Sequence, residues 1–470
     1  MQQTRRNPAP RGRTRQPNPQ GRTNPQNRQS PQGRANPQNP QGQPNPQNRQ
    51  NPQGRPIPRN KPKPARKPTP AQIKQAKREK QQRDPNRVRF FSLDGKIDVP
   101  MLVIIMVLLV FGITMMFSAG HALSYQETGN SLYYVLHQLP AAGLGLLGMF
   151  ALTLFDYRFL RHEIRLFKTN IRTTLAHILL AATMFLNFLT IFIGIRAEIG
   201  GQKRWLPMPI IGQFQPSDFL KVAVVIFFAY YIHKNFDKMR LFFYGIAKPV
   251  MILAMIVLSI ISQMHMSCML IILMVFAVML FVGGVNVKEA LPIALAAVLA
   301  VYLVIVVFKV GYFEDRIIFM DPLSDPGDGS YQNYQSALAI GSGGIWGKGF
   351  GNSSQKYYYL PEAQNDFVFA ILVEEFGLVG GVVVILLFLI FTARGFYIAR
   401  HAEDKFGCLL ATGITFMTGL QAFLNLGVTL CCIPNTGVPL PFFSYGGTAL
   451  MLQLWEMGLL LSISKRAKLS

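Results

Sequence analysis

Ten stretches of mostly apolar residues follow one another from residue 99 to the end of this 470-residue chain. A helix needs roughly 20 such residues to cross about 30 Å of hydrocarbon. It also satisfies its own backbone hydrogen bonds, which lipid cannot do. The pattern therefore predicts an all-α polytopic membrane protein with ten transmembrane helices. They are expected near residues 99–119, 139–155, 174–195, 215–232, 244–262, 266–284, 288–309, 366–393, 406–429 and 443–463.

The residues before the first span have a different composition. Residues 1–98 contain 23 Lys and Arg against four Asp and Glu, so this part carries +19 of the formal +24 charge. Its Asn-Pro-Gln repeats offer almost no apolar surface to bury, which predicts disorder. We divide the chain into a disordered basic tail at 1–90, in which 71–89 could form a basic surface helix, and a membrane domain at 91–470.

A basic tail beside a membrane domain favours contact with anionic lipid headgroups, at about 1 kcal/mol per basic residue near the surface. Nucleic acid would suit the same charge, but we expect no specific nucleic-acid partner. A third interpretation is a solvated tail that only enforces the orientation of the spans.

Basic residues in short loops set the orientation of membrane helices. The loops after the second, fourth and eighth spans and the C-terminus are all basic, and with ten spans all of them lie on the side of the tail. We therefore expect a multi-pass protein of the cytoplasmic membrane with both termini in the cytoplasm. The connection at 310–365 then forms a large extracytoplasmic loop, and loops of such length are usually functional.

The segment 435–448 has an irregular composition although it lies between two apolar stretches. It reads NTGVPLPFFSYGGT and is rich in Gly, Pro and polar residues. Irregular backbone is tolerated at membrane depth only where protein or a wet cavity supplies its hydrogen bonds. We expect this segment to line a cavity.

Charged residues inside spans cost roughly 2.5 to 3.5 kcal/mol at a helix centre, so each needs a partner or a wet cavity. Asp218 and Lys221 share one helical face. Either they pair with each other, or Lys221 holds an anionic group such as a pyrophosphate. Arg204 and Trp205 form either an interfacial anchor or an anion site, and a cation on the outer face favours the anion site. Glu456 in the last span is expected to bond to another helix.

Asp366 stands at the outer end of the eighth span. A carboxylate there is often a helix cap, but Glu362, Glu374 and Glu375 are close in sequence and are expected to gather around one cavity mouth. A general base needs such a carboxylate within reach of a substrate hydroxyl. His265 is either a hydrogen-bonded buried histidine or a proton carrier.

Four blocks of the membrane part resemble the SEDS family (shape, elongation, division and sporulation proteins, including FtsW, RodA and SpoVE). The chain departs from the family's common pattern at Gln364-Asn365, where His-Thr is usual, and around His265, where Pro-Asp-Leu-Gly-Thr is common. The role of that second Asp is either lost or has passed to His265. The matching blocks contain Arg204, Trp205, Gln215, Pro216, Ser217 and Lys221; Gln335 and Ser342; Lys356, Glu362 and Asp366; and Ser444, Tyr445, Gly446 and Gly447.

The resemblance implies a bacterial peptidoglycan glycosyltransferase that polymerises lipid II at the outer membrane face and releases undecaprenyl pyrophosphate. Asp366 would be the catalytic base, facing an enclosed cavity in which Arg204, Lys221 and Lys356 offset the charge of the leaving group. No cofactor site or metal-ligand cluster is identified, although a divalent cation could accompany the pyrophosphate. Further substrate contacts are expected from Trp205, Gln215, Gln335, Ser342, Glu362, Ser444, Tyr445, Gly446 and Gly447.

The family works beside a class B penicillin-binding protein, a transpeptidase, so the resemblance also implies such a partner. The Gly-Val-Pro-Leu-Pro-Phe form and the long tail favour division or sporulation members over elongation members. Two alternatives stay open. One is a flippase for the lipid-linked precursor, because transporters also have broken helices and polar spans. The other is a catalytically silent scaffold.

Overall fold

The computed structural model describes residues 90–91, 95–165, 172–196, 203–208, 212–261, 263, 265–293, 295 and 331–468. The predicted tail, most of the span expected at 288–309 and the first part of the long connection lie outside the described residues.

Among the described residues, eight helices are long and apolar enough to cross a membrane, which confirms the all-α polytopic class. They are α2 (Val99–Thr128), α3 (Tyr133–Leu154), α4 (Leu175–Ile193), α5 (Pro216–Lys234), η3 with α6 (Phe243–Ile261), α11 (Val368–Arg400), α12 (Lys405–Thr429) and α13 (Gly447–Ser464).

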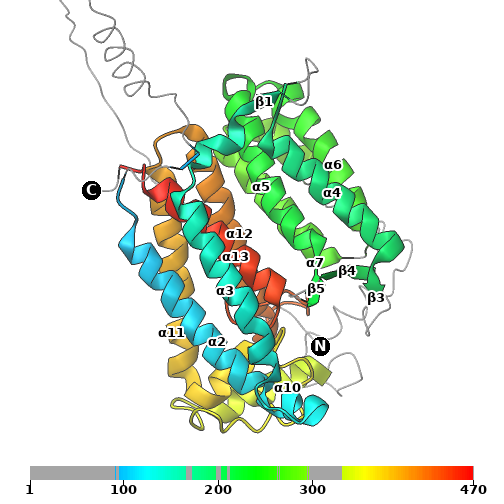
Figure 1. The fold of residues 1–470 in the computed structure, drawn as a ribbon, viewed down its shortest axis with the longest axis vertical. Helices are drawn as coiled ribbons and strands as arrows, with labels where there is room; N and C mark the ends of the chain where they lie inside the picture. The colour runs from blue at the N-terminus through cyan, green and yellow to red at the C-terminus, as the bar shows by residue number, and fades with distance from the viewer. Residues whose placement is uncertain are drawn as a thin grey trace, which may run out of the picture. The chain divides into compact units, whose positions relative to one another are not determined.

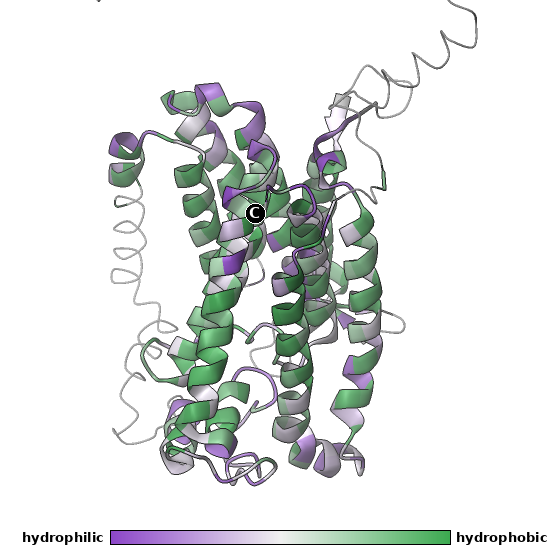
Figure 2. Cartoon of the chain, turned by 90° about the vertical axis from the view of Figure 1, so that its left-hand side faces the viewer, coloured by the Kyte–Doolittle hydropathy of each residue, from purple (hydrophilic) through white to green (hydrophobic). Residues whose placement is uncertain are grey.

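A shorter apolar helix, α7 (Met266–Val282), follows α6 where the sixth span was expected. The helices run side by side along a common direction (Figure 1). Apolar residues cover their middle parts, and hydrophilic residues gather toward both ends (Figure 2). α5, α12 and α13 are mostly buried, whereas the other spans expose many apolar side chains. This is the pattern of a bundle whose outer surface is solvated by lipid.

α3 and α13 pack closely because small residues lie between them. Gly145 is surrounded by Leu454 and Met451 of α13, and Gly458 faces the backbone of Met149. Small residues at such contacts let the backbones of membrane helices approach each other. The packing fixes α13, and with it the irregular segment that leads into it.

Short strands were not predicted from the sequence, and the connections on both sides of α4 contain them. β1 (Glu163–Arg165) pairs with β2 (Arg172–Thr174), and β4 (Lys203–Met208) pairs with both β3 (Ile195–Arg196) and β5 (Gly212–Phe214), all antiparallel. Pairing of this kind satisfies the backbone groups of a connection without a helix. A second addition is α10 (Tyr331–Gly343), a 13-residue helix inside the long connection.

α11 is interrupted at Gly377, whose backbone (φ 69°, ψ −169°) is not helical. The loop that follows α10 fits into this break. The N–H groups of Lys348 and Gly349 donate, at 3.0 and 2.9 Å, to the carbonyls of Glu374 and Glu375 shortly before the break. The first N–H groups after the break donate to loop carbonyls in return. A Cβ at position 377 would lie 2.3 Å from a loop carbonyl oxygen, so only glycine fits.

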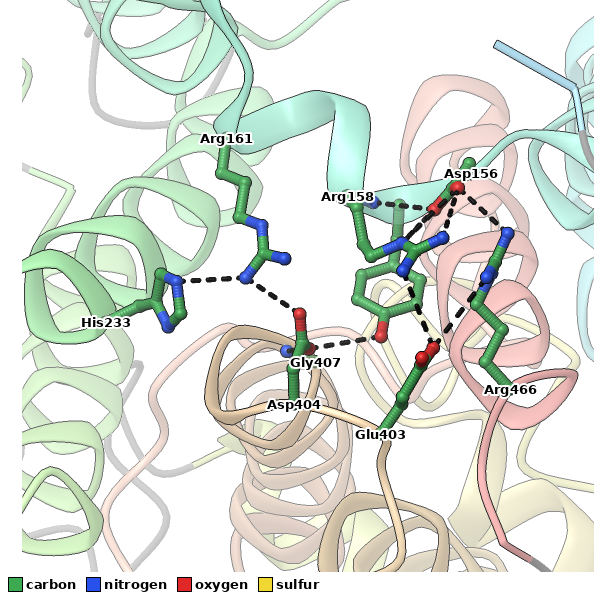
Figure 3. A network of polar contacts seen from close by, with 9 residues as sticks. Asp156, Arg158, Arg161, His233, Glu403, Asp404, Gly407 and Arg466 are labelled. Carbon is green, nitrogen blue, oxygen red and sulfur yellow. Dashed lines mark hydrogen bonds and ion pairs between the residues drawn. The ribbon is translucent and has the colours of Figure 1, made fainter. Parts of the chain in front are cut away.

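The two ends of the membrane part meet at one end of the bundle. The N–H of Asp98 donates to the hydroxyl of Ser464 at 3.1 Å. Nearby, the buried carboxylate of Asp156 pairs with Arg158 at 3.2 Å and with Arg466 at 3.0 Å (Figure 3). These ion pairs tie the connection after α3 to the C-terminal end of α13.

Candidate active site

The irregular segment between α12 and α13 is held by hydrogen bonds from neighbouring elements. The N–H of Tyr445 donates to the carbonyl of Gln364 at 2.8 Å, and the N–H of Gly446 donates to the side chain of Gln138 at 2.9 Å. Inside the segment, the N–H of Leu440 donates to the hydroxyl of Ser444 at 2.7 Å. Protein groups thus satisfy this backbone, as expected of irregular chain at membrane depth.

Asp366 lies beside this segment, just before α11. Its side chain is half-buried, and its Oδ2 would be 3.5 Å from a Cβ placed on Gly437. Gly437 has a positive φ of 60°, a conformation that favours glycine. The helix cap is Phe367, and no side chain caps this helix. Asp366 is therefore not an N-cap, and its carboxylate faces the irregular segment.

Asn425 of α12 fixes the backbone on both sides of this contact. Its side-chain amide donates to the carbonyl of Asp366 at 2.7 Å and to the carbonyl of Val438 at 2.8 Å. Asn425 is 1% exposed, and its Oδ1 has no hydrogen-bond partner among the described residues. One buried side chain thus holds the loop carrying Asp366 against the irregular segment.

The predicted cations lie on the other side of the segment. Arg204 of β4 is half-buried and donates to the carbonyl of Gln263 at 3.2 Å. Lys221 pairs with Asp218 at 2.9 Å, as one of the two interpretations required. The hydroxyl of Ser267, at the start of α7, bonds to the carbonyl of Thr436 and so connects this side to the neighbourhood of Asp366.

His265 lies between α6 and α7, within hydrogen-bonding distance of two groups at the start of α5. Its Nδ1 is 3.0 Å from the hydroxyl of Ser217 and 3.4 Å from the amide nitrogen of Gln215. Burial lowers the pKa of His265 to about 3, although the negative charge of Asp218 opposes the shift. A hydrogen-bonded neutral histidine agrees with the first of the two predicted roles.

A cavity of about 40 Å³ lies beneath the irregular segment, between α5, α12 and α13. Asp218, Lys221 and Glu456 line it together with residues 439–442, which confirms that the segment lines a cavity. The cavity has room for about one water molecule, and it does not reach Asp366. It is therefore not the enclosed, sugar-sized chamber that we expected to find beside that carboxylate.

The structure also corrects the predicted roles of three acidic and basic residues near Asp366. Glu374 and Glu375 are fully buried and do not surround a cavity mouth. Glu374 accepts from Lys348 at 2.6 Å and from groups of the neighbouring loop. Lys356 donates to Glu375 at 2.9 Å, to Ser118 and to a loop carbonyl, so its three protons are engaged. Lys356 therefore holds the loop and has no proton left for a leaving group.

The remaining predicted contact residues lie at several places in the bundle. Trp205 is half-buried on β4, and Gln335 is buried on α10, where its Oε1 has no described partner. Ser342 donates to Glu374 at 3.2 Å, and so supports the loop. Glu362 bonds to Asn365 and precedes Asp366 by one turn. The half-buried ring of Tyr445 lies 4.8 Å from that of Tyr134, and Gly447 begins α13.

Three residues with clear roles at this site were not singled out from the sequence. Asn425 lies inside a predicted apolar span and Gln138 directly before one, and an uncharged polar residue at such a place signals a hydrogen bond at membrane depth. Gly377 follows the Glu374-Glu375 pair, and it could have been recognised only as one glycine among many in an apolar run. Their partners are 13 to 308 residues away in sequence, so spacing alone could not reveal them.

These features define a polytopic membrane protein in which Asp366, Arg204 and Lys221 lie around an irregular segment between the last two spans. The chain belongs to the cell cycle protein family of FtsW, RodA and SpoVE, whose family model matches residues 99–469. The match covers every described helix and all the residues of the candidate site.

Curated relatives and solved structures agree with this assignment. The chain is 35% identical over 373 residues to a "Probable peptidoglycan glycosyltransferase FtsW" of Geobacter sp. (strain M18), covering 79% of this chain and 97% of the relative. It is 33% identical over 374 residues to the "Stage V sporulation protein E" of Bacillus subtilis (strain 168), covering 79% and 98%.

Two solved structures have similar folds. A chain from a structure described as "Structural coordination of polymerization and crosslinking by a peptidoglycan synthase complex" has a TM-score of 0.62 and 26% identity, covering 78% of this chain and 97% of that one. The rod shape determining protein RodA of Thermus thermophilus has a TM-score of 0.56 and 25% identity, covering 80% and 98%. The helical architecture is thus shared over the whole membrane part.

Proposed function

We propose that this chain is a peptidoglycan glycosyltransferase that polymerises lipid II, with Asp366 as the general base. The observation that carries the proposal is the placement of one half-buried carboxylate against Gly437, where Asn425 fixes the backbone on both sides. A base must be held in position and yet be reachable by a substrate hydroxyl. The family membership and the names of the relatives support the same reaction class.

In the proposed reaction, Asp366 takes the proton of the acceptor sugar's 4-hydroxyl. The oxygen then forms a bond to the anomeric carbon of the donor as the bond from that carbon to the pyrophosphate oxygen breaks. Undecaprenyl pyrophosphate leaves with the electron pair, the configuration is inverted, and Asp366 releases its proton to water. Lipid tails would enter sideways between the helices.

Arg204 and Lys221 are the cations that would face the leaving pyrophosphate. Fixed cations in a partly dry site stabilise developing negative charge more than cations in water do. Among the described residues, no three His, Cys, Asp or Glu side chains converge on one point. Any divalent cation in the proposed reaction would accompany the pyrophosphate of the substrate.

We also propose ten spans with both termini in the cytoplasm. The contact of Asp98 with Ser464 requires an even number of crossings between them, and the basic loops favour the cytoplasm for that side. In this orientation Asp366 lies at the outer face, and the basic tail lies beside anionic headgroups.

A transpeptidase of the class B penicillin-binding type is the proposed partner, since one of the similar solved structures is of a peptidoglycan synthase complex that coordinates polymerisation with crosslinking.

The decisive experiment is polymerisation of lipid II by the purified protein. Asp366→Asn keeps the shape of the side chain and removes the base, so we expect the rate to fall by about 10²–10⁴-fold. Glu163→Gln, an exposed carboxylate on β1, is the matched control and should retain the wild-type rate. Retained polymerisation by a folded Asp366→Asn variant would exclude the base role. Lipid II movement across vesicles without polymerisation by the wild type would favour the flippase.

A further inference from the structure

Glu456 is a buried carboxyl group that the proposed reaction does not use. It lies on α13, is 6% exposed, and lines the cavity beneath residues 439–442. The sequence led us to expect a bond to another helix, but its Oε2 has no hydrogen-bond partner among the described residues. A carboxylate oxygen buried at this depth without a hydrogen-bond partner is costly when the group is ionised.

The charged groups around Glu456 do not compensate it. Lys221 and Asp218 act on it electrostatically across the cavity, and they already form an ion pair with each other at 2.9 Å. The three groups therefore carry one unit of negative charge in excess when Glu456 is ionised. Two events can remove that excess at Glu456. Either the carboxylate binds a proton, or the ammonium group of Lys221 turns from Asp218 toward Glu456.

The other described elements packed around the cavity supply no further cation. α12 contributes Gln421, and the irregular segment contributes Ser444. Cys268 of α7 and the neutral ring of His265 lie near the Asp218–Lys221 pair. α3 packs along α13 but has no charged residue between positions 139 and 154. Arg204 of β4 acts electrostatically on His265 but does not line the cavity, so the choice between the two events rests on Glu456, Lys221 and Asp218.

We infer that Glu456 is a proton-binding site that controls the position of Lys221. With a proton bound, Glu456 is neutral and Lys221 stays paired with Asp218, as in the structure. When Glu456 loses its proton, its carboxylate competes for the ammonium group and draws Lys221 along the cavity toward α13. The inference rests on the proposed function in one respect: Lys221 is taken as a cation that faces the pyrophosphate. Glu456 is then a positioning residue, since it acts on substrate only through Lys221.

The proton itself can be observed without any substrate. Infrared difference spectroscopy of the purified protein during a pH change should show the C=O band of a protonated, buried carboxylic acid near neutral pH. Glu456→Gln should remove this band, and the exposed control Glu163→Gln should keep it. Asp218→Asn should also remove the band, because Lys221 then loses its partner and pairs with an ionised Glu456. A missing band in the wild type, or an unchanged band in Asp218→Asn, would overturn the inference.

The effect on Lys221 is measured by the pH dependence of polymerisation. In the wild type, KM for lipid II should rise with pH by about tenfold or more as Lys221 turns away, the size expected for one charged hydrogen bond. Glu456→Gln cannot ionise, so its KM should stay flat over the same range. Equal pH profiles for the two proteins would refute the positioning role. If the wild type makes no polymer, the proposed function fails, while the infrared result still decides proton binding.

Discussion

Replacing Lys356 by Met tests whether a buried ion pair holds the outward loop against α11. In the wild type its ammonium group donates to Glu375 at 2.9 Å, to the hydroxyl of Ser118 at 3.2 Å and to the carbonyl of Gly351 at 2.7 Å. The side chains of Lys356 and Glu375 are 2% and 0% exposed. Methionine keeps the length of the side chain but leaves the carboxylate buried without its counter-ion.

Removing one partner of a buried ion pair costs about 3–5 kcal/mol, because the other charge stays desolvated. The free energy of unfolding should therefore fall by that amount in Lys356→Met. Adding Glu375→Met should recover most of the loss, since apolar side chains of similar volume replace a buried pair at little net cost. Lys348→Met is the graded comparison. Lys348 is 32% exposed, and its partner Glu374 keeps other donors, so we expect a loss of about 1 kcal/mol.

The measurement is reversible unfolding in mixed detergent micelles for the wild type, the single variants and the Lys356→Met/Glu375→Met double variant. Limited proteolysis of residues 344–366 reports whether the loss is local, because a loosened loop opens before the bundle does. A loss in Lys356→Met no larger than in Lys348→Met would refute the reasoning. So would a double variant as unstable as the single one.

Two further predictions concern hydrogen bonds and charges that connect distant segments. Asn425→Leu removes both hydrogen bonds to the backbone beside Asp366. The value of kcat for polymerisation should fall by about 10²-fold with little change in KM, because displacing a reacting group by about 1 Å has an effect of that size. A change in KM with an unaltered kcat would contradict this role. Asp156→Asn leaves the guanidinium groups of Arg158 and Arg466 without their buried carboxylate and should lower the free energy of unfolding by about 3 kcal/mol. Glu403→Gln is its control: that side chain is 41% exposed and 3.7 Å from both arginines, so a change of less than about 1 kcal/mol is expected (Figure 3).

The sequence alone determined which parts of the chain form the bundle. Long apolar runs can only become helices in lipid, so the observed spans begin and end within a few residues of the predicted ones in most cases. The largest differences are at the end of α2, the end of α11 and the start of α3, and α2 and α3 extend toward each other until only Gly129 to Leu132 separate them. These ends are less apolar, and periodicity in them is too weak to mark a boundary. Motif residues such as Asp366 and Lys221 were also singled out without coordinates, and their roles in the reaction stay predictions.

Only the tertiary structure decided which groups the charged residues contact. A sequence gives no distances between side chains. It could not show that Lys356 pairs with Glu375. Nor could it show that Oε2 of Glu456 has no hydrogen-bond partner among the described residues. The sequence therefore assigned Lys221 and Lys356 the same role beside the leaving group, whereas the structure gives them different partners. The same holds for the break at Gly377, which exists because a loop some thirty residues earlier inserts its backbone there. Local composition fixes where a chain becomes helical in a membrane, whereas the pairing of buried charges depends on which helices pack together.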